Sequence, residues 1–397
     1  MTSLLTQGPP DASGAAETAV DPVQEAFAGA DWGLAESARS QEFHPYPARY
    51  IPALPRQVLQ LTQPRGGLVL DPFCGSGTTL AEARAYGLSS VGVDINPVAC
   101  LISRVRTSTW QPGDEEQLTE HRRALVDSAL RSSDVAPEFA RIPRLDHWFN
   151  DYAQVALSGA VSYAKSLPKG DPWSDRLSAA ISAATVRISR QDSDTRYAAV
   201  EKPGDQTTVA QSLHRSLDRV ANWLRGASPR YEESTRAEVI HGDARDLSAI
   251  SDGSVALACF SPPYPNAYEY WLYHKYRMYW LGFDAVAVRR DEIGARPHYS
   301  RPNGLTENDF AEQMSQVFSS MKRVLHDGAY SVVVVGDSVI GGREIDNGAL
   351  LTHVAKSCGY SAEYAGERAI HVGKSSFNRA HSRGRRTEHI LVFRNAR

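Results

Sequence analysis

Four consecutive residues, Ser261-Pro262-Pro263-Tyr264, have the types and order best suited to chemistry on a planar ring. Each proline removes a backbone N–H and fixes its φ near about −65°, so the carbonyls of Ser261 and Pro262 are held outward without a strand partner. The serine hydroxyl is a further hydrogen-bond acceptor, and Tyr264 offers an aromatic face. Together they complement a flat ring with an exocyclic amino group. Taken alone, the same residues also fit a proline-rich strand exit without chemistry.

A glycine-rich turn is the second candidate site, with the sequence DPFCGSGTT at residues 71–79. An apolar run at 68–70 predicts a strand before the turn, and residues 80–86 predict a helix after it. A second predicted strand at 91–93 ends at Asp94, where such units hydrogen-bond a ribose about 20 residues after the first glycine. Glycines let a ligand approach the backbone, and the helix N-terminus favours an anionic group. The whole unit predicts a nucleoside cofactor.

The elements that must position these motifs predict an α/β fold. The apolar run Val255 to Phe260 predicts a buried strand that brings Ser261 to its end, where open α/β sheets place their chemistry. Asp243 follows another predicted strand beside a glycine, so it either touches the base of a cofactor or is a plain turn carboxylate. Further strands are expected at 238–240, 330–335, 361–365 and 389–393, and helices at 54–61, 307–325 and 349–358.

The composition is that of an ordinary soluble globular protein. The chain has 42% hydrophobic and 22% charged residues, a formal net charge of −3 and a pI near 6.5. These values exclude a generally basic DNA coat but allow a local basic surface. No apolar stretch approaches the about 20 residues that span a bilayer, and the N-terminus lacks a signal pattern, so we expect a cytoplasmic protein. The four cysteines stand singly, so we expect reduced thiols and no metal site.

Three regions differ in composition. Residues 1–38, rich in Ala, Gly, Pro and Asp, predict a flexible leader. Residues 39–106 and 237–397 carry the predicted sheet and its motifs, whereas residues 107–236 predict a helical insertion. Its helices are expected at Glu115 to Leu130, Tyr152 to Leu167, Trp173 to Arg190 and Val209 to Arg225. We expect its aromatic residues Trp148, Phe149, Trp173 and Trp223 in its own core rather than around a ligand.

Prolines, aromatic residues and cations gather in four further segments. The proline-dense segment 44–52 predicts a rigid loop, either packed on the next strand or closing over a ligand at the glycine turn. Residues 265–282 interleave aromatic residues with cations, which suits an extruded base, and residues 284–305 predict a polar loop. The segment 371–386 carries cations without a carboxylate, so we favour phosphate contact over a solvated loop. These cations are Lys374, Arg379, Arg383, Arg385 and Arg386.

With both motifs in view, the chain resembles the S-adenosylmethionine-dependent DNA amino-methyltransferases, which methylate the exocyclic nitrogen of cytosine or adenine. The matching stretches are DPFCGSGTT at 71–79, GVDINP at 92–97, GDARDL at 242–247 and SPPY at 261–264. HPYPARYIP at 44–52 resembles the segment that covers the methionine end of the cofactor. The motifs follow the direct rather than the permuted order. The helical insertion departs from the compact family pattern and is expected either to help recognise DNA or to contact another protein.

The resemblance implies a Rossmann-like methyltransferase fold with a seven-stranded sheet and S-adenosylmethionine as cofactor. It implies that Ser261 and Pro262 accept the amino hydrogens of the target base, with Pro263 completing the motif, and that Tyr264 stacks on a base flipped out of double-stranded DNA. Asp94 would bind the cofactor's ribose and Asp243 its adenine edge. The expected cofactor-binding residues are Tyr46, Asp71, Phe73, Gly75, Gly77, Thr78, Asp94, Ile95 and Asp243.

The target base and the substrate class stay open on the sequence. A serine at the first motif position is associated with cytosine N4, and adenine N6 is the alternative. An RNA amino-group methyltransferase and a non-catalytic nucleic-acid-binding subunit are further alternatives. A dehydrogenase is disfavoured because the turn lacks the third spaced glycine. The target sequence, and whether a cognate restriction or other defence protein accompanies the chain, are likewise open.

Overall fold

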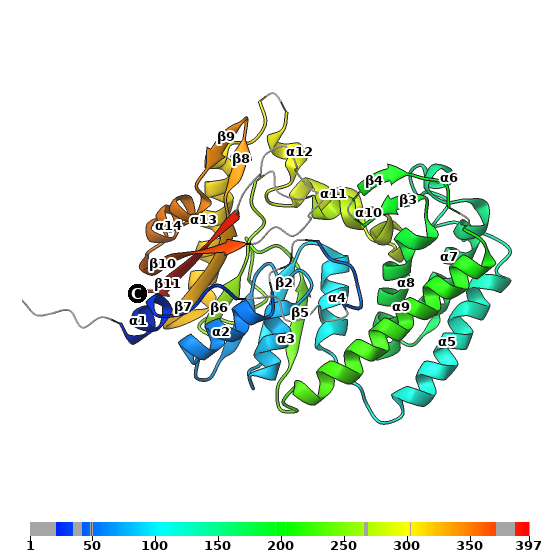
Figure 1. Ribbon diagram of the computed structural model, residues 1–397, viewed down its shortest axis with the longest axis horizontal. Coiled ribbons are helices and arrows are strands. Elements are labelled where there is room, and N and C mark those ends of the chain that lie inside the picture. Colours follow the sequence, from blue (N-terminus) through cyan, green and yellow to red (C-terminus); the bar gives the residue numbers. More distant parts are fainter. Residues whose placement is uncertain are drawn as a thin grey trace, which may run out of the picture.

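The computed structural model describes residues 21–34, 42–47, 49, 51–194, 196–202, 204–265, 269–301, 303–370 and 386–396. Figure 1 shows two lobes, one built on a central sheet and one mostly helical. Helices α4 (Pro97–Thr107) and α10 (Tyr270–Leu281) contact both lobes and join them.

The central sheet has seven strands in the order β10-β11-β7-β6-β1-β2-β5. Strands β5, β2, β1, β6 and β7 are parallel, whereas β11 is antiparallel to both of its neighbours. This mostly parallel sheet with flanking helices confirms the predicted Rossmann-like α/β fold class. The strands are β1 (Leu68–Asp71), β2 (Ser90–Asp94), β5 (Ala237–His241), β6 (Val255–Phe260), β7 (Leu325–Gly336), β10 (Tyr360–Ile370) and β11 (Arg386–Asn395).

Both faces of the sheet are covered, which explains why its central strands are continuous apolar runs. Side chains alternate between faces along a strand. Val332 and Val334 lie in the hydrophobic cluster under α1 (Pro22–Ala28), α2 (Ala53–Thr62) and α3 (Thr78–Ala85). Val333 and Val335 lie in the cluster under α13 (Glu307–Val324) and α14 (Asn347–Ser357). The buried sheet therefore holds its carboxyl-end loops on a rigid base.

Gly92 in β2 marks the tightest contact beneath the glycine turn. A Cβ at this position would lie 2.6 Å from Leu80 Cδ1 and 2.7 Å from Cys74 Cβ. Gly92→Ala is therefore expected to lower the free energy of unfolding by about 1–3 kcal/mol, as overpacked core substitutions do. Urea unfolding measures the change. Gly226→Ala in α9, where nothing lies within 4 Å of the new methyl group, is the matched control and should leave stability equal or higher.

The predicted flexible leader is wrong for residues 21–34. Asp21 accepts a hydrogen bond from the Val23 N–H at 2.8 Å and caps helix α1, which begins at Pro22. Phe27 and Trp32 are buried against the sheet. Because one short helix with two large aromatic side chains buries enough apolar area to pack, the low periodicity of this region was misleading. The rest of the predicted leader lies outside the described residues.

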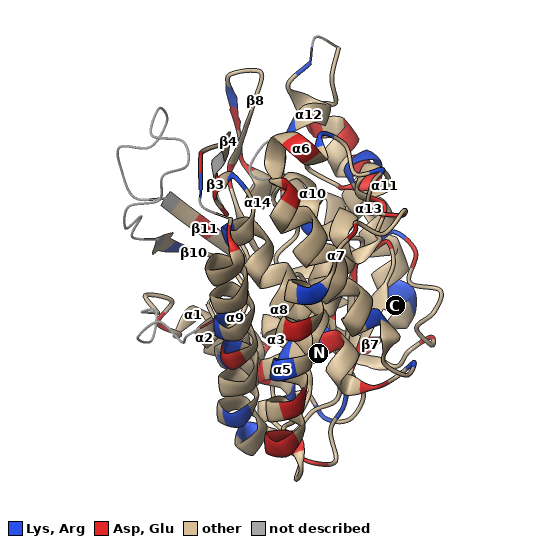
Figure 2. Ribbon diagram, turned by 90° about the vertical axis from the view of Figure 1, so that its right-hand side faces the viewer, with Lys and Arg blue, Asp and Glu red and all other residues tan. Residues whose placement is uncertain are grey.

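The second lobe contains the predicted helical insertion. Its helices are α5 (Asp114–Arg131), α6 (Leu145–Trp148), α7 (Asp151–Ser166), α8 (Pro172–Ile188) and α9 (Gln206–Ala227). Between α8 and α9 the chain forms a hairpin of two short strands, β3 (Gln191–Ser193) and β4 (Arg196–Ala199). The four helices expected from periodicity are confirmed to within about three residues at each end. Figure 2 shows α5, α7, α8 and α9 running roughly side by side. Its tryptophans and Phe149 pack in one hydrophobic cluster, as expected.

The predicted polar loop at 284–305 is wrong in part. It contains α11 (Ala285–Asp291) and α12 (Arg296–Tyr299), and Ile293 and Ala295 between them are buried. The hairpin of β8 (Ser338–Ile340) and β9 (Arg343–Ile345) was also not predicted. Elements this short carry little periodicity, so tertiary packing decides them. In the described part of the chain, no helix is long and apolar enough to cross a membrane.

Candidate active site

The two sequence motifs meet because β1 and β6 are adjacent parallel strands. Their carboxyl ends lie at the same edge of the sheet, where α/β proteins bind ligands. The Thr79 hydroxyl, in the first turn of α3, donates to the Cys259 carbonyl in β6 at 3.1 Å. This bond ties the glycine turn to the strand that carries Ser261.

The glycine turn is held by neighbours on two sides. Gly75 and Gly77 have φ values of +51° and +79°, which favour glycine. The Ser103 hydroxyl of α4 donates to the Gly75 carbonyl at 2.8 Å. A Cβ on Gly77 would lie 3.0 Å from the Ser103 Cα, so the turn also packs directly on α4. The turn is thus fixed before any ligand arrives.

Asp94, at the end of β2, accepts two backbone hydrogen bonds. Its Oδ2 accepts the Gly75 N–H at 2.9 Å, and its Oδ1 accepts the Asn96 N–H at 2.8 Å. Burial raises the pKa of Asp94 to about 6 although both hydrogen bonds favour the charged form. The carboxylate therefore links the glycine turn to β2, and each oxygen keeps a second lone pair for a ligand.

Asp71, at the end of β1, is fully buried and faces the turn. Its Oδ1 accepts the Phe73 N–H at 3.1 Å, and burial raises its pKa to about 7. Phe73 is half-buried and packs on Phe260, with ring centroids 5.9 Å apart. Thr78 is buried at the start of α3, and Ile95 is half-buried beyond β2. The predicted cofactor residues of β1, β2 and the turn thus lie around one loop. Asp71 is the buried residue from which this loop begins.

Tyr46 lies over the glycine turn, as the resemblance implied for segment 44–52. Its hydroxyl is 3.2 Å from the position that a Cβ on Gly75 would take. Its ring stacks on Tyr270 at a centroid distance of 5.8 Å and lies 5.2 Å from His274. Burial raises the pKa of Tyr46 well above its ordinary value, with the charge of Asp94 adding to the shift. The segment is therefore held against α10 as well as against the turn.

Asp243 lies beyond β5 and is bound to a neighbour two residues away. Both of its oxygens pair with the Arg245 guanidinium, and Oδ1 also accepts the Arg245 N–H at 2.9 Å. This ion pair favours the turn-carboxylate interpretation that the sequence left open. A role at the adenine edge of a cofactor stays a prediction, and it requires the Arg245 side chain to share Asp243 with the ligand.

The Ser261–Tyr264 motif follows β6 as an extended turn. Pro262 is buried, whereas Ser261 and Tyr264 are half-buried. Within the described part of the chain, neither the Ser261 hydroxyl nor the Pro262 carbonyl accepts a hydrogen bond. The Tyr264 hydroxyl lies 3.2 Å from where a Cβ on Gly336 would stand, at the end of β7. The two acceptors remain available beside the glycine turn.

Glu292 and Gly294 belong to this site but were missed from the sequence. Glu292 is buried, and its two oxygens accept the N–H groups of Tyr270 and Trp271 at 3.0 and 2.9 Å, at the start of α10. Burial raises its pKa to about 8, and the negative charge of Asp94 adds to the shift. A Cβ on Gly294 would lie 3.0 Å from the Tyr264 carbonyl. The lone glycine between Ile293 and Ala295 is the sequence signal that could have revealed the close approach.

The aromatic helix α10 differs from the expected binding surface for an extruded base. Trp271, Tyr276 and Trp280 are buried in the cluster that forms the core of the helical lobe. The helix is apolar on most sides because it lies between the sheet lobe and the helical lobe, as Figure 1 shows. Its role is to join the two lobes and to support Tyr46 through Tyr270 and His274.

The predicted phosphate-binding segment lies almost wholly outside the described residues. Lys374, Arg379, Arg383 and Arg385 fall in the stretch 371–385 that the structure does not describe. Arg386 begins β11, where its backbone pairs with Ile370 of β10. The assignment of these residues to nucleic-acid binding stays a prediction.

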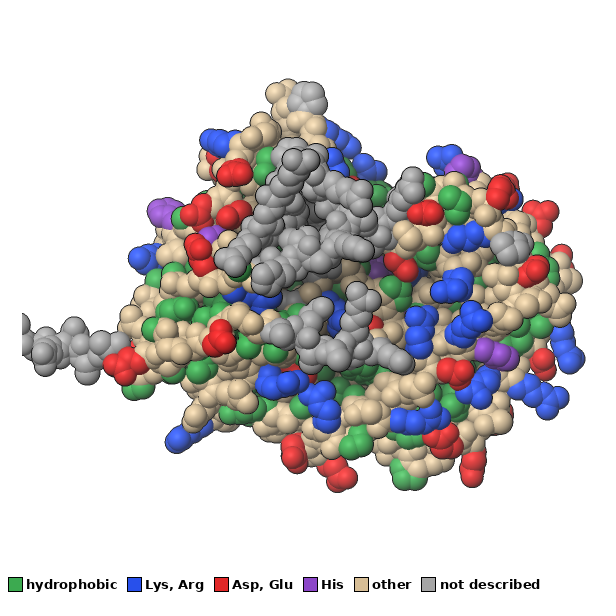
Figure 3. Space-filling view, in the orientation of Figure 1, with side chains coloured by type: hydrophobic (Ala, Val, Ile, Leu, Met, Phe, Trp, Pro, Cys, Tyr) green, Lys and Arg blue, Asp and Glu red, His purple; other side chains and the backbone are tan. Residues whose placement is uncertain are grey.

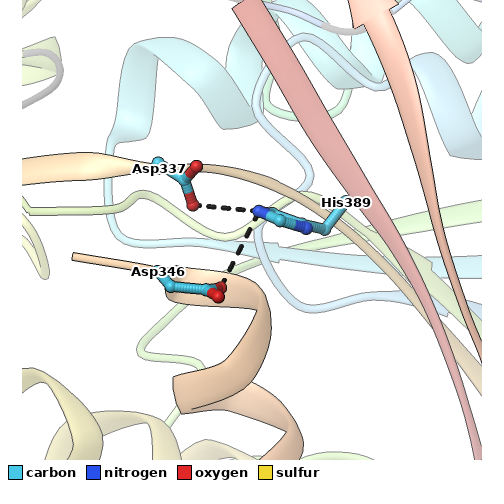
Figure 4. A group of neighbouring side chains, drawn as sticks. All are labelled: Asp337, Asp346 and His389. Carbon is cyan, nitrogen blue, oxygen red and sulfur yellow. Dashed lines mark hydrogen bonds and ion pairs between the residues drawn. The ribbon is translucent and has the colours of Figure 1, made fainter. Parts of the chain in front are cut away.

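A group of polar side chains lies where β7 ends. Asp337 follows β7, Asp346 precedes α14, and His389 points between them from β11 (Figure 4). His389 Nε2 is 2.9 Å from Asp337 Oδ1 and 3.8 Å from Asp346 Oδ1, and the three potential metal ligands lie within 4.8 Å of one another. Asp346 also caps α14 by accepting the Ala349 N–H at 2.8 Å. The imidazole–carboxylate contact and the cap account for this arrangement without a metal.

Residues 22–104 match the family model N6_N4_Mtase, described as DNA methylase. The chain is 33% identical over 128 residues to the Type II methyltransferase M.MvaI of Kocuria varians, covering 30% of this chain and 28% of that protein. It is 23% identical over 251 residues to the Type II methyltransferase M.BsoBI of Geobacillus stearothermophilus, covering 57% and 49%. The matched regions therefore span less than half the length of these relatives.

Solved structures resemble the chain more distantly. A Thermus thermophilus protein complexed with S-adenosyl-L-methionine is 20% identical, with a TM-score of 0.25 over 39% of this chain and 54% of that chain. TrmN from Thermus thermophilus is 12% identical, with a TM-score of 0.35 over 88% and 50%. Similarity at this level assigns no role to individual residues.

Proposed function

We propose that this chain, which belongs to the N4/N6 family of DNA amino-methyltransferases, transfers a methyl group from S-adenosylmethionine to the exocyclic amino nitrogen of a flipped base in double-stranded DNA. Cytosine N4 is the proposed target because the motif begins with Ser261. The observation that carries the proposal is the position of the glycine turn and the Ser261–Tyr264 motif at the ends of the adjacent strands β1 and β6. A cognate restriction or other defence protein is a further proposed partner.

The residues around the glycine turn fit a cationic nucleoside cofactor. Asp94 and Glu292 are carboxylates with pKa values raised by burial, and neither pairs with a lysine or arginine in the described part of the chain. A half-buried and a buried carboxylate that repel each other favour a ligand with a positive charge. S-adenosylmethionine carries a sulfonium and an ammonium group. We propose Asp94 at the ribose hydroxyls, Tyr46 over the methionine end, and Glu292 as an additional wall of the same pocket.

The Ser261–Tyr264 motif prepares the amino group for methylation. An amino nitrogen conjugated with the ring is a poor nucleophile because its lone pair is delocalised. Accepting its two N–H bonds at the Ser261 hydroxyl and the Pro262 carbonyl localises that pair and aims it at the methyl group. When bound, the cofactor supplies a methyl group activated by the positive sulfur. Ser261 thus orients the nucleobase and forms no covalent bond with it. No side chain next to Ser261 in the sequence could act as a general base to make its hydroxyl a nucleophile.

The reaction also requires a base outside the helical stack, because the amino group is otherwise paired. Tyr264 is half-buried beside the two acceptors, and its hydroxyl end rests over Gly336. Gly294 and Glu292 hold the motif and the start of α10 together from the other side. This support keeps the aromatic face in one position, which a stacking partner for a flipped base needs.

The test is to express the protein in a modification-free bacterial host and to sequence its genomic DNA by a method that reports N4-methylcytosine and N6-methyladenine. N4-methylcytosine in a fixed sequence context is the expected result. N6-methyladenine in a fixed context would correct the base and keep the reaction. Unmodified DNA from a protein that binds S-adenosylmethionine would contradict DNA as the substrate and favour structured RNA.

Cofactor affinity is expected to rise with pH. The raised pKa values of Asp94 and Glu292 mean that both are partly protonated between about pH 6 and about pH 8, and a cation binds better to the deprotonated forms. For the ligand-free protein the sign is opposite, because raised carboxyl pKa values stabilise the fold at low pH and this stability is lost as pH rises through them. Calorimetry across this range should show tighter binding toward pH 8 and proton release.

Glu292→Gln provides the control for this pH dependence. The amide keeps the size of the side chain and one oxygen acceptor for the start of α10, but it cannot titrate. The rise in affinity near pH 8 should flatten in this variant, while the rise near pH 6 from Asp94 persists. An identical pH profile in both proteins would remove Glu292 from the proposed pocket.

A further inference from the structure

Three arginines of the helical lobe form a concentrated positive charge. Arg187 at the end of α8 and Arg215 of α9 are exposed, and Arg219 of α9 is half-buried. Arg215 and Arg219 are four residues apart on one helix, so they are neighbours on its surface, and like charges at this spacing destabilise a helix. We call these three residues the α8–α9 arginine cluster.

None of the three guanidinium groups has a carboxylate oxygen within 4.0 Å among the residues that the structure describes. The Nε–H of Arg219 is buried and donates to no partner in that part of the chain. Burial lowers the pKa of Arg219, and repulsion from Arg187 lowers it further. Burial lowers the pKa of Lys202 as well, where the charges of Asp192 and Asp194 oppose the shift and that of Arg187 adds to it. Arg187 and Arg219 therefore repel each other, and an anion bound between them would relieve this repulsion.

Four arginines of α4 and the helical lobe are each paired with a carboxylate. Arg104 binds Asp175, Arg225 binds Glu115, Arg176 binds Asp114 and Arg122 binds Asp218. Asp194 is the carboxylate whose charge raises the pKa of Arg219. It is already paired with Arg277 of α10. These four arginines are thus neutralised by carboxylates, whereas, within the described part of the chain, the three arginines of the α8–α9 arginine cluster are not.

One arginine of the cluster, Arg219, acts electrostatically on the segment that leads to the candidate active site. Burial lowers the pKa of His44, and the positive charges of Arg277 and Arg219 add to the effect. His44 precedes Tyr46, the residue that lies over Gly75, by two positions. Figure 3 shows blue Lys and Arg side chains gathered over the right-hand lobe on the face where α9 runs in Figure 1. A long polyanion at the active site could therefore reach the cluster.

We propose that the α8–α9 arginine cluster binds backbone phosphates of the duplex from which the target base is flipped, so that the helical insertion is a DNA-positioning element. The proposal rests on the proposed function. Guanidinium groups match the geometry of phosphate oxygens, and exposed cations without carboxylate partners exchange counterions for phosphates at little cost. A protein partner would need a matching acidic surface, whereas DNA is already the proposed substrate of the adjacent site.

The test compares Arg187→Ala/Arg215→Ala with wild type in the binding of a fluorescently labelled duplex, measured by anisotropy over a series of salt concentrations. Each lost phosphate contact should reduce the slope of log K against log salt by about 0.9, and duplex affinity should fall roughly tenfold for the pair. Arg187→Lys/Arg215→Lys keeps the charges and should retain the slope. Arg123→Ala is the matched control, because Arg123 is an exposed cation of the same lobe that lies near Asp127.

Suppose that the wild-type protein binds and methylates duplex DNA, and that the double alanine variant has the same slope and affinity as Arg123→Ala. This result would overturn the cluster proposal and leave the proposed function intact. A loss of affinity for structured RNA without a loss for duplex DNA would overturn it as well. A wild-type protein that binds cofactor but no duplex would overturn both. Equal melting temperatures of the variants show that any loss arises from the surface rather than from unfolding.

Discussion

Asp94→Ala is expected to weaken S-adenosylmethionine binding about 100-fold, or about 2.8 kcal/mol. The substitution removes the acceptor for the Gly75 and Asn96 N–H groups, at 2.9 and 2.8 Å, together with the proposed ribose contact. Hydrogen bonds to a charged group contribute about 1.5–3 kcal/mol each, so the loss of the turn's anchor alone accounts for an effect of this size. Calorimetry with purified protein measures the affinity directly.

Two further variants separate the cofactor contact from general effects. Asp94→Asn keeps one carbonyl acceptor and should lose about tenfold in affinity, less than the alanine variant. Asp246→Ala removes an exposed carboxylate beyond β5, and its affinity should be unchanged. Unchanged cofactor affinity in Asp94→Ala would exclude Asp94 from the cofactor site. An equal loss in Asp246→Ala would show that the fold, rather than the pocket, had responded.

The sheet and the glycine turn could be predicted because their signals are local. The side chains of the continuous apolar run Val332 to Val335 are buried alternately on the two faces of the sheet. Such a run is typical of a central strand in a sheet that is covered on both faces. Gly75 and Gly77 take φ values that favour glycine, so their spacing directly reflects the turn. These features depend on a few residues that are neighbours in the sequence. The order of strands and motifs along the chain was therefore sufficient to predict the sheet and the glycine turn.

The support of the site could not be predicted because it depends on residues far apart in the chain. Tyr46 packs on Tyr270 and His274, and Glu292 binds the start of α10. No local pattern marks such contacts. The aromatic residues of α10 were misinterpreted for the same reason, since their spacing shows that they are apolar on all sides but not which lobe surrounds them.

Charge patterns showed a related limit. The basic segment 371–386 stands out in the sequence because its cations are close together along the chain. The α8–α9 arginine cluster does not stand out, because Arg187 and Arg215 come from different helices with a hairpin between them. Whether a cation is paired depends on the packing of helices: Arg176 is neutralised by Asp114 across the lobe, whereas Arg187 has no carboxylate partner among the residues that the structure describes. Sequence alone therefore finds runs of charge but misses charge assembled by the fold.

Tyr264→Ala is expected to lower kcat/KM for methyl transfer to duplex DNA by about 10- to 100-fold while cofactor affinity stays the same. Stacking of a base on an aromatic ring contributes about 1–3 kcal/mol, and this ring is proposed to hold the flipped base beside Ser261 and Pro262. The cofactor turn is anchored by Asp94 and Ser103 instead, so it should not respond. Transfer of a labelled methyl group measures activity, and calorimetry measures cofactor binding.

The position of the ring, rather than its hydroxyl, should carry this effect. Tyr264→Phe keeps the aromatic face and should retain most of the activity. Gly336→Ala should have an intermediate effect, because its methyl group would lie 3.2 Å from the Tyr264 hydroxyl and 3.5 Å from Cζ, and would displace the ring. Cofactor affinity that falls as far as activity in Tyr264→Ala would contradict a role at the base. Since Tyr264 and the cofactor turn follow different strands, the two readouts distinguish base positioning from cofactor binding.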